Sequence, residues 1–146
     1  LYCNYLVFLE TMTNSLSPEL FRVIDANLNR LKEGIRVIED IMRYRDNNKN
    51  LSLKLKELRH KSRINQYKEL LQNRDSIGDV LKTSTKSELE RKDITSIIIA
   101  NFKRAQESSR VLEELFKLEN LEYSENFKSI RYQLYNLEKE IILGEK

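Results

Sequence analysis

Apolar residues recur at helical spacing through most of the 146-residue chain. One stripe of residues three and four positions apart comprises Ile24, Leu28, Leu31, Ile35, Ile38 and Met42. A narrower seam near the end of the chain comprises Phe127, Ile130, Leu134, Leu137 and Ile141. These patterns predict an all-α protein with long amphipathic helices, at about 18–44, 51–73, 93–119 and 124–143.

Short polar motifs mark the ends of these helices. Ser17 followed by Pro18 is typical of a helix start, and Asp93 and Ser124 are expected to cap the later helices. Thr85-Lys-Ser-Glu88 resembles a capping box, which predicts a short helix inside the otherwise irregular segment 74–93. Gly144 is expected to end the last helix.

A polar motif occurs twice in the chain. The stretches 24–44 and 98–118 align without a gap and share the pattern A-N-x-x-R-x-x-E-x-x-R-V-x-E, and 56–60 resembles 128–132. We therefore expect two helical hairpins, about 18–73 and 93–143, related by an approximate twofold axis. They form a single domain, 17–146, after an N-terminal extension of residues 1–16. The small residues Gly34 and Ser108 predict a close approach of the repeated helices.

Composition excludes several classes of function. The net charge of +3, with acids and bases mixed throughout, argues against a general nucleic-acid binder. There is no apolar run of the length that a membrane span needs. The single cysteine, Cys3, cannot form a disulfide within the chain, which favours a reducing, cytoplasmic location. The chain is also shorter than the roughly 200 residues of a β/α barrel.

The repeated asparagine and arginine side chains are the main candidates for a site. Asn27, Arg30, Asn101 and Arg104 border the apolar stripes, and guanidinium groups grip phosphate well. On this hypothesis Arg30 and Arg104 are catalytic, and the substrate-binding residues are Asn27, Asn101, Arg59, Arg74, Glu107 and Arg110. Two alternatives stay open: a ladder of ion pairs on solvated faces, and a buried network that only sets helix register.

The loop Arg74-Asp75-Ser-Ile-Gly78-Asp79-Val80 is a second candidate. Asp75 and Asp79 suit Mg²⁺, which takes one or two carboxylates together with phosphate oxygens, and Asp79 is then also catalytic. The alternative is an ordinary polar turn. His60 is the only histidine, so a multi-histidine metal site is excluded, and we expect His60 to be structural or on the surface.

These motifs resemble a known family of thiamine biosynthesis: a helical domain often fused in front of thiamine-phosphate synthase and also found alone. The resemblance covers about residues 21–141 and rests on the stretches 22–40, 58–60, 74–80, 100–114 and 131–139. Such domains are described as monofunctional hydroxymethylpyrimidine-phosphate kinases. The resemblance therefore implies phosphorylation of hydroxymethylpyrimidine phosphate to the pyrophosphate, with ATP and Mg²⁺. Thiamine-phosphate synthase activity is not expected, because the chain is too short for a barrel.

Other classes of function stay open beside the kinase. One is a non-catalytic helical module that binds thiamine precursors or docks thiamine-phosphate synthase, and another is a small nucleic-acid-binding protein. The expected partners are small-molecule phosphates, with neither nucleic acid nor membrane. The apolar seam of the last helix also allows a homodimer.

Overall fold

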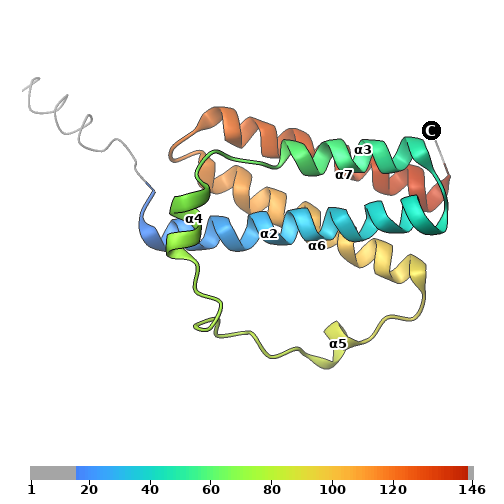
Figure 1. Ribbon diagram of the computed structural model, residues 1–146, viewed down its shortest axis with the longest axis horizontal. Coiled ribbons are helices and arrows are strands. Elements are labelled where there is room, and N and C mark those ends of the chain that lie inside the picture. Colours follow the sequence, from blue (N-terminus) through green and yellow to red (C-terminus); the bar gives the residue numbers. More distant parts are fainter. Residues whose placement is uncertain (1–15, 145–146) are drawn as a thin grey trace, which may run out of the picture.

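Every regular element in residues 16–144, the part of the chain that the computed structural model describes, is a helix (Figure 1). This confirms the predicted all-α class. The elements are α2 (Pro18–Asp40), the π-helix η1 (Ile41–Arg45), α3 (Lys49–Lys61), α4 (Tyr67–Asn73), α5 (Lys86–Leu89), α6 (Ile94–Phe116) and α7 (Leu121–Leu143).

Two long helices, α2 and α6, form the centre of the bundle. Helix α3 packs against α2, and α7 packs against α6, so that α3 and α7 lie side by side on one side of the central pair (Figure 1). The predicted apolar stripe of α2 is buried, and it meets Phe102, Leu112 and Phe116 of α6 and Phe127 of α7 in one core. The predicted twofold relation between the hairpins stays a prediction.

Gly34 allows the central helices to approach closely. A Cβ atom at this position would lie 3.0 Å from the backbone oxygen of Asn101 and 3.5 Å from the Cβ of Ala105, both on α6. Contacts of 3.0 Å are tighter than a packed core normally accepts. The predicted close approach of the repeated helices at Gly34 is confirmed, and Ser108 is buried as well.

The second helix was predicted to run without a break to about Asn73, and this prediction is wrong because the helix is interrupted. Helix α3 ends at Lys61, and α4 begins only at Tyr67. Side chains of α7 satisfy the backbone groups that the break leaves open: the Asn126 amide donates to the Lys61 carbonyl, and the Tyr123 hydroxyl accepts from the Asn65 N–H. The interruption therefore depends on tertiary contacts, which local sequence does not reveal.

The caps predicted from the sequence are present with one exception. The capping roles of Ser17 and Asp93 and the Thr85 capping box are confirmed, and Gly144 ends α7 in the left-handed conformation. The expected cap at Ser124 is wrong, because Asn120 accepts from the Tyr123 N–H and starts α7 a turn earlier.

Residues 1–15 and 145–146 are outside the described residues, so most of the predicted N-terminal extension is too. Among residues 16–144, no helix is long and apolar enough to cross a membrane.

Candidate functional site

The second Asn–Arg motif lies at the crossing of α2 and α6, where α6 packs closely on Gly34, and the first lies earlier on α2. Gly34 touches Asn101 and Ala105, which stand on either side of Arg104, and Arg30 lies about one turn before Gly34. The two asparagines make the same bond: each amide donates to the carbonyl four residues earlier, that of Val23 for Asn27 and that of Ile97 for Asn101, at 2.9 Å. Neither asparagine is thus hydrogen-bonded to its arginine.

Arg30 and Arg104 are exposed on their helices. Neither has an ion pair within the described part of the chain, and Glu107 is also exposed without one. The ion-pair ladder does form at Arg110, which contacts Glu113 and Glu114 at 3.3 and 3.0 Å. At Arg30 and Arg104 neither the ladder nor the buried register network forms, so these two cations stay available to an anion.

A buried carboxylate ties the long loop to α2 near this crossing. Asp25, which is 5% exposed, accepts hydrogen bonds from Nε and Nη2 of Arg74 at 2.7 and 2.8 Å. This bidentate pair places the start of the loop about one and a half turns from Arg30. Arg74 is thus paired with Asp25, and the hydrogen bonds that it donates to the Asp25 carboxylate raise the pKa of the Arg74 guanidinium.

The two loop aspartates make local turn contacts. Asp75 Oδ1 accepts from the Gly78 N–H at 2.7 Å, and Asp79 Oδ1 accepts from the Leu81 N–H at 2.9 Å. A Cβ at residue 78 would lie 2.3 Å from Asp75 Oδ2, so the Asp75 side chain would have to shift to admit a larger residue there. Within residues 16–144 no three His, Cys, Asp or Glu side chains are grouped to hold a metal. Magnesium binding by Asp75 and Asp79 stays a prediction.

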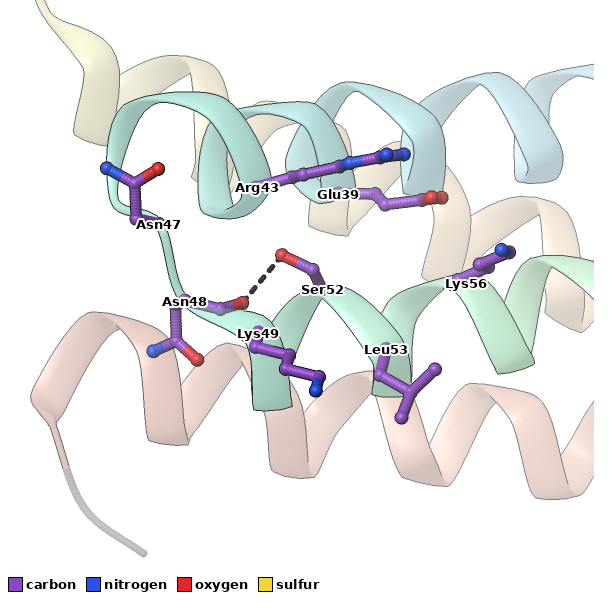
Figure 2. A pocket seen from close by; sticks show the side chains of 8 residues that line it. All are labelled: Glu39, Arg43, Asn47, Asn48, Lys49, Ser52, Leu53 and Lys56. Carbon is purple, nitrogen blue, oxygen red and sulfur yellow. Dashed lines mark hydrogen bonds between the residues drawn. The ribbon is translucent and has the colours of Figure 1, made fainter.

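A pocket of about 310 Å³ opens elsewhere, between the C-terminal end of α2, η1 and α3 (Figure 2). Its lining includes Glu39, Arg43, Asn48, Ser52 and Lys56. None of the sequence-predicted site residues lines this pocket, although Arg59 is bonded to Glu39.

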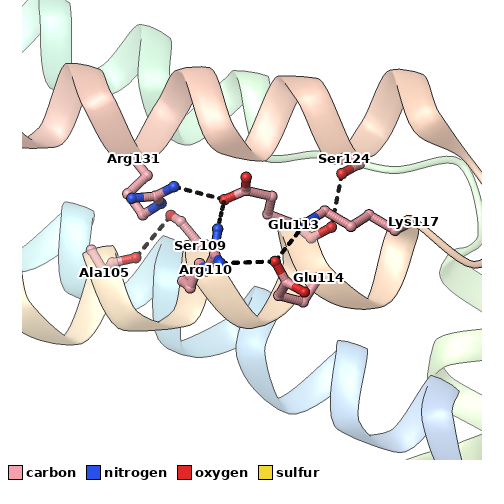
Figure 3. Close-up of polar contacts among 8 residues, drawn as sticks. All are labelled: Ala105, Ser109, Arg110, Glu113, Glu114, Lys117, Ser124 and Arg131. Atoms are coloured by element: carbon pink, nitrogen blue, oxygen red, sulfur yellow. Dashed lines mark hydrogen bonds and ion pairs between the residues drawn. The ribbon is translucent and has the colours of Figure 1, made fainter.

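Each hairpin contains a buried glutamate that pairs with an arginine of the second helix. In the first hairpin, Arg59 donates to Glu39 at 2.7 and 3.2 Å. In the second, Arg131 donates to Glu113 at 2.8 Å (Figure 3). In this structure Arg59 is paired with Glu39, and its expected role in substrate binding stays a prediction.

The charge state of Glu113 follows from these contacts. Burial acts to raise the pKa of its carboxyl, but hydrogen bonds and charge from Arg131 and Arg110 outweigh burial and hold that pKa below the ordinary value. Glu113 is therefore ionised at neutral pH and cannot act there as a proton donor. His60 is exposed, as predicted, and partial desolvation together with nearby cations lowers its pKa.

Sequence reasoning missed Asp25, Arg131 and the pocket. Asp25 carries no local signal beyond an acid at the edge of a stripe, whereas Arg131 could have been found as the repeat counterpart of Arg59. One feature of the sequence could have indicated the pocket. Glu39 and Ser52 are 13 positions apart, whereas the corresponding residues of the second repeat, Glu113 and Ser124, are 11 positions apart. Two extra residues in one repeat indicate that its local structure differs from that of the other repeat. In the first hairpin the extra residues coincide with the π-helix η1.

The chain is similar to proteins named thiamine-phosphate synthase. It is 40% identical over 124 residues to one from Nostoc punctiforme, 38% identical over 138 residues to one from Rhodopirellula baltica, and 36% identical over 136 residues to one from Synechocystis. These matches cover 84%, 90% and 92% of this chain but only 35%, 36% and 39% of the relatives. The chain thus spans just over a third of their length. No solved structure gives a significant match.

These names correct one expectation and support another. The predicted enzyme class, a phosphomethylpyrimidine kinase without thiamine-phosphate synthase activity, is wrong: the curated relatives are named thiamine-phosphate synthase, not kinase. The expected link to thiamine biosynthesis is supported by the same names. A family model matches residues 22–140, which include both hairpins, the long loop and the crossing of α2 and α6. The chain belongs to the ThiD2 family.

Proposed function

We propose that this chain acts in thiamine biosynthesis as a helical module that binds a phosphorylated thiamine precursor at the crossing of α2 and α6. The family match and the names of the relatives support the link to thiamine. The position of the binding site is inferred from two arginines, Arg30 and Arg104. Both are exposed, neither has an ion pair in residues 16–144, and they belong to the two helices that cross at Gly34.

Two guanidinium groups suit a phosphate ester. Each presents a planar fork of donors that can bind two phosphate oxygens, which a lysine cannot do. The buried carboxylate nearby does not compete with the ligand for Arg30 and Arg104, because Asp25 is paired with Arg74. Recognition through phosphate predicts that the precursor binds far more tightly than the corresponding alcohol, and that affinity falls as salt concentration rises.

The test is a calorimetric titration of the purified chain with hydroxymethylpyrimidine phosphate and, separately, with the unphosphorylated alcohol. Arg30→Ala and Arg104→Ala should each weaken binding of the phosphate about tenfold, the value of one charge-assisted contact. Arg63→Ala is the matched control, since Arg63 is also exposed and without an ion pair in the described chain. Equal affinity for ester and alcohol, or equal loss in the control, would contradict the proposal.

A second candidate function is docking to the rest of a thiamine-phosphate synthase. The observation in its favour is the loop between α4 and α6, where Ile77, Val80 and Leu81 are 88%, 94% and 84% exposed. Large apolar side chains with such exposure are typical of contact surfaces. Co-elution of this chain with a thiamine-phosphate synthase that lacks its own helical segment tests docking. Val80→Ser with Leu81→Ser should abolish co-elution, and unchanged co-elution would refute a role for the loop.

A further inference from the structure

The pocket between α2, η1 and α3 has the size and lining of a small-molecule site. Its volume of about 310 Å³ is at the lower end of the range for ligand pockets. Ser52 points from α3 towards α2, and Glu39 and Arg43 line the pocket from the side of α2 and η1 (Figure 2). The pocket is separate from the crossing of α2 and α6, since neither Arg30 nor Arg104 lines it.

The extra residues of the first hairpin build this pocket. Helix α2 continues into the π-helix Ile41–Arg45, and Asn47 then reverses the chain with a positive φ of 49°. A π-turn accommodates inserted residues and widens the helix, and such turns are frequent at functional sites.

The second hairpin, which is two positions shorter, closes differently. There the Ser124 hydroxyl donates to the Glu113 carbonyl and joins α7 to α6 (Figure 3). In the first hairpin the corresponding Ser52 hydroxyl bonds back to the Asn48 carbonyl of its own segment, so it makes no such link to α2.

The charges around the pocket are predominantly positive and have no carboxylate partner in the described chain, although the Arg43 guanidinium lies 4.9 Å from the centre of the Tyr44 ring. Arg43, Lys49 and Lys56 line it, and none of them has an ion pair within residues 16–144. The one acidic lining residue, Glu39, is neutralised by its two hydrogen bonds from Arg59. The site therefore presents three positive charges that no carboxylate of the described chain offsets.

We propose that this pocket binds the pyrophosphate group of a small molecule. A single phosphate ester carries a charge of about −1.5 to −2 at neutral pH, which is less than the three cations can neutralise. A pyrophosphate group carries more negative charge and has more acceptor oxygens over a greater length. Arg43 can bind its oxygens bidentately, and the two lysines add point charges. This second anion site does not depend on the function proposed for the α2–α6 crossing.

Titration of the whole chain with inorganic pyrophosphate and with inorganic phosphate, followed by calorimetry and by amide NMR spectra, tests the proposal. Pyrophosphate should bind more tightly than phosphate and should shift the amide signals of residues 43–56. Lys56→Gln should weaken pyrophosphate binding about fivefold, and Arg43→Gln about tenfold. Both side chains are exposed, so neither change should disturb folding, which circular dichroism can verify.

The repeat provides a matched control. Lys128 is the counterpart of Lys56 in the second hairpin, and it is likewise exposed without an ion pair in the described chain. Lys128→Gln should leave pyrophosphate affinity within twofold of the wild type. The proposal is overturned if pyrophosphate fails to bind, if Lys128→Gln weakens binding as much as Lys56→Gln, or if the shifted amides lie only at the α2–α6 crossing.

Discussion

Glu113→Gln is the substitution whose effect on stability follows most directly from the structure. The carboxylate of Glu113 is 6% exposed and accepts from Arg131, whose side chain is 13% exposed. Glutamine has nearly the same shape, so the core packing stays, but Arg131 then faces a neutral acceptor. A hydrogen bond between charged groups contributes about 1.5–3 kcal/mol, so we expect a loss of about 2 kcal/mol in the free energy of unfolding.

The contact with Arg110 adds little to this loss. Arg110 is half exposed, and such surface pairs contribute about 0–1 kcal/mol because water screens them. A total loss of about 2 kcal/mol corresponds to a melting temperature lower by about 8 °C in a chain of this size. Urea denaturation followed by circular dichroism measures the free energy directly.

Glu114→Gln is the matched control for this measurement. Glu114 follows Glu113 in the chain and pairs with Arg110 and Lys117, but it is 46% exposed. Its substitution should change stability by less than about 0.5 kcal/mol. If both variants lose the same amount, or if Glu113→Gln loses less than about 0.5 kcal/mol, the buried pair does not stabilise the hairpin as argued.

Further predictions concern pH, packing and the loop. Because the pKa of Glu113 is lowered in the folded state, its contribution is complete above the unfolded value of 4.5 and is lost as pH falls through the folded value. The stability difference between wild type and Glu113→Gln should therefore shrink towards pH 3 in denaturation experiments. Gly34→Val should lower the melting temperature by about 4–12 °C, because overpacking against the Asn101 carbonyl costs about 1–3 kcal/mol; an unchanged value would contradict the close contact. Asp25→Asn should release Arg74 and speed limited proteolysis within 74–93 several-fold; unchanged cleavage would show that the pair does not hold the loop.

The helices could be predicted because their signals are local. Apolar spacing and caps such as Ser17 and Asp93 depend on residues a few positions apart, and these assignments agree with the structure. The break after Lys61 could not be predicted, because it is stabilised by Asn126, 65 residues away. The same reason explains the missed partner of Arg59: Glu39 belongs to another helix, and only packing shows that the two side chains meet.

The candidate site was accessible to sequence reasoning only in part. Repetition of polar residues singled out Arg30 and Arg104, and the structure places them on the two helices that cross at Gly34. The pattern could not show which arginines are already occupied, since Arg74 and Arg59 look the same in sequence as Arg30. Buried carboxylates on other helices decide this, and they take up Arg74 and Arg59.

The most direct test of the proposed function is an NMR titration of the chain, labelled with ¹⁵N in its arginine side chains, with hydroxymethylpyrimidine phosphate. The Nε–Hε signals of Arg30 and Arg104 should shift and saturate together, while those of Arg59 and Arg74, held by Glu39 and Asp25, should stay in place. The unphosphorylated alcohol should shift none of them. If Arg30 and Arg104 do not respond, or if only the signal of Arg43 does, the phosphorylated precursor does not bind at the crossing of α2 and α6.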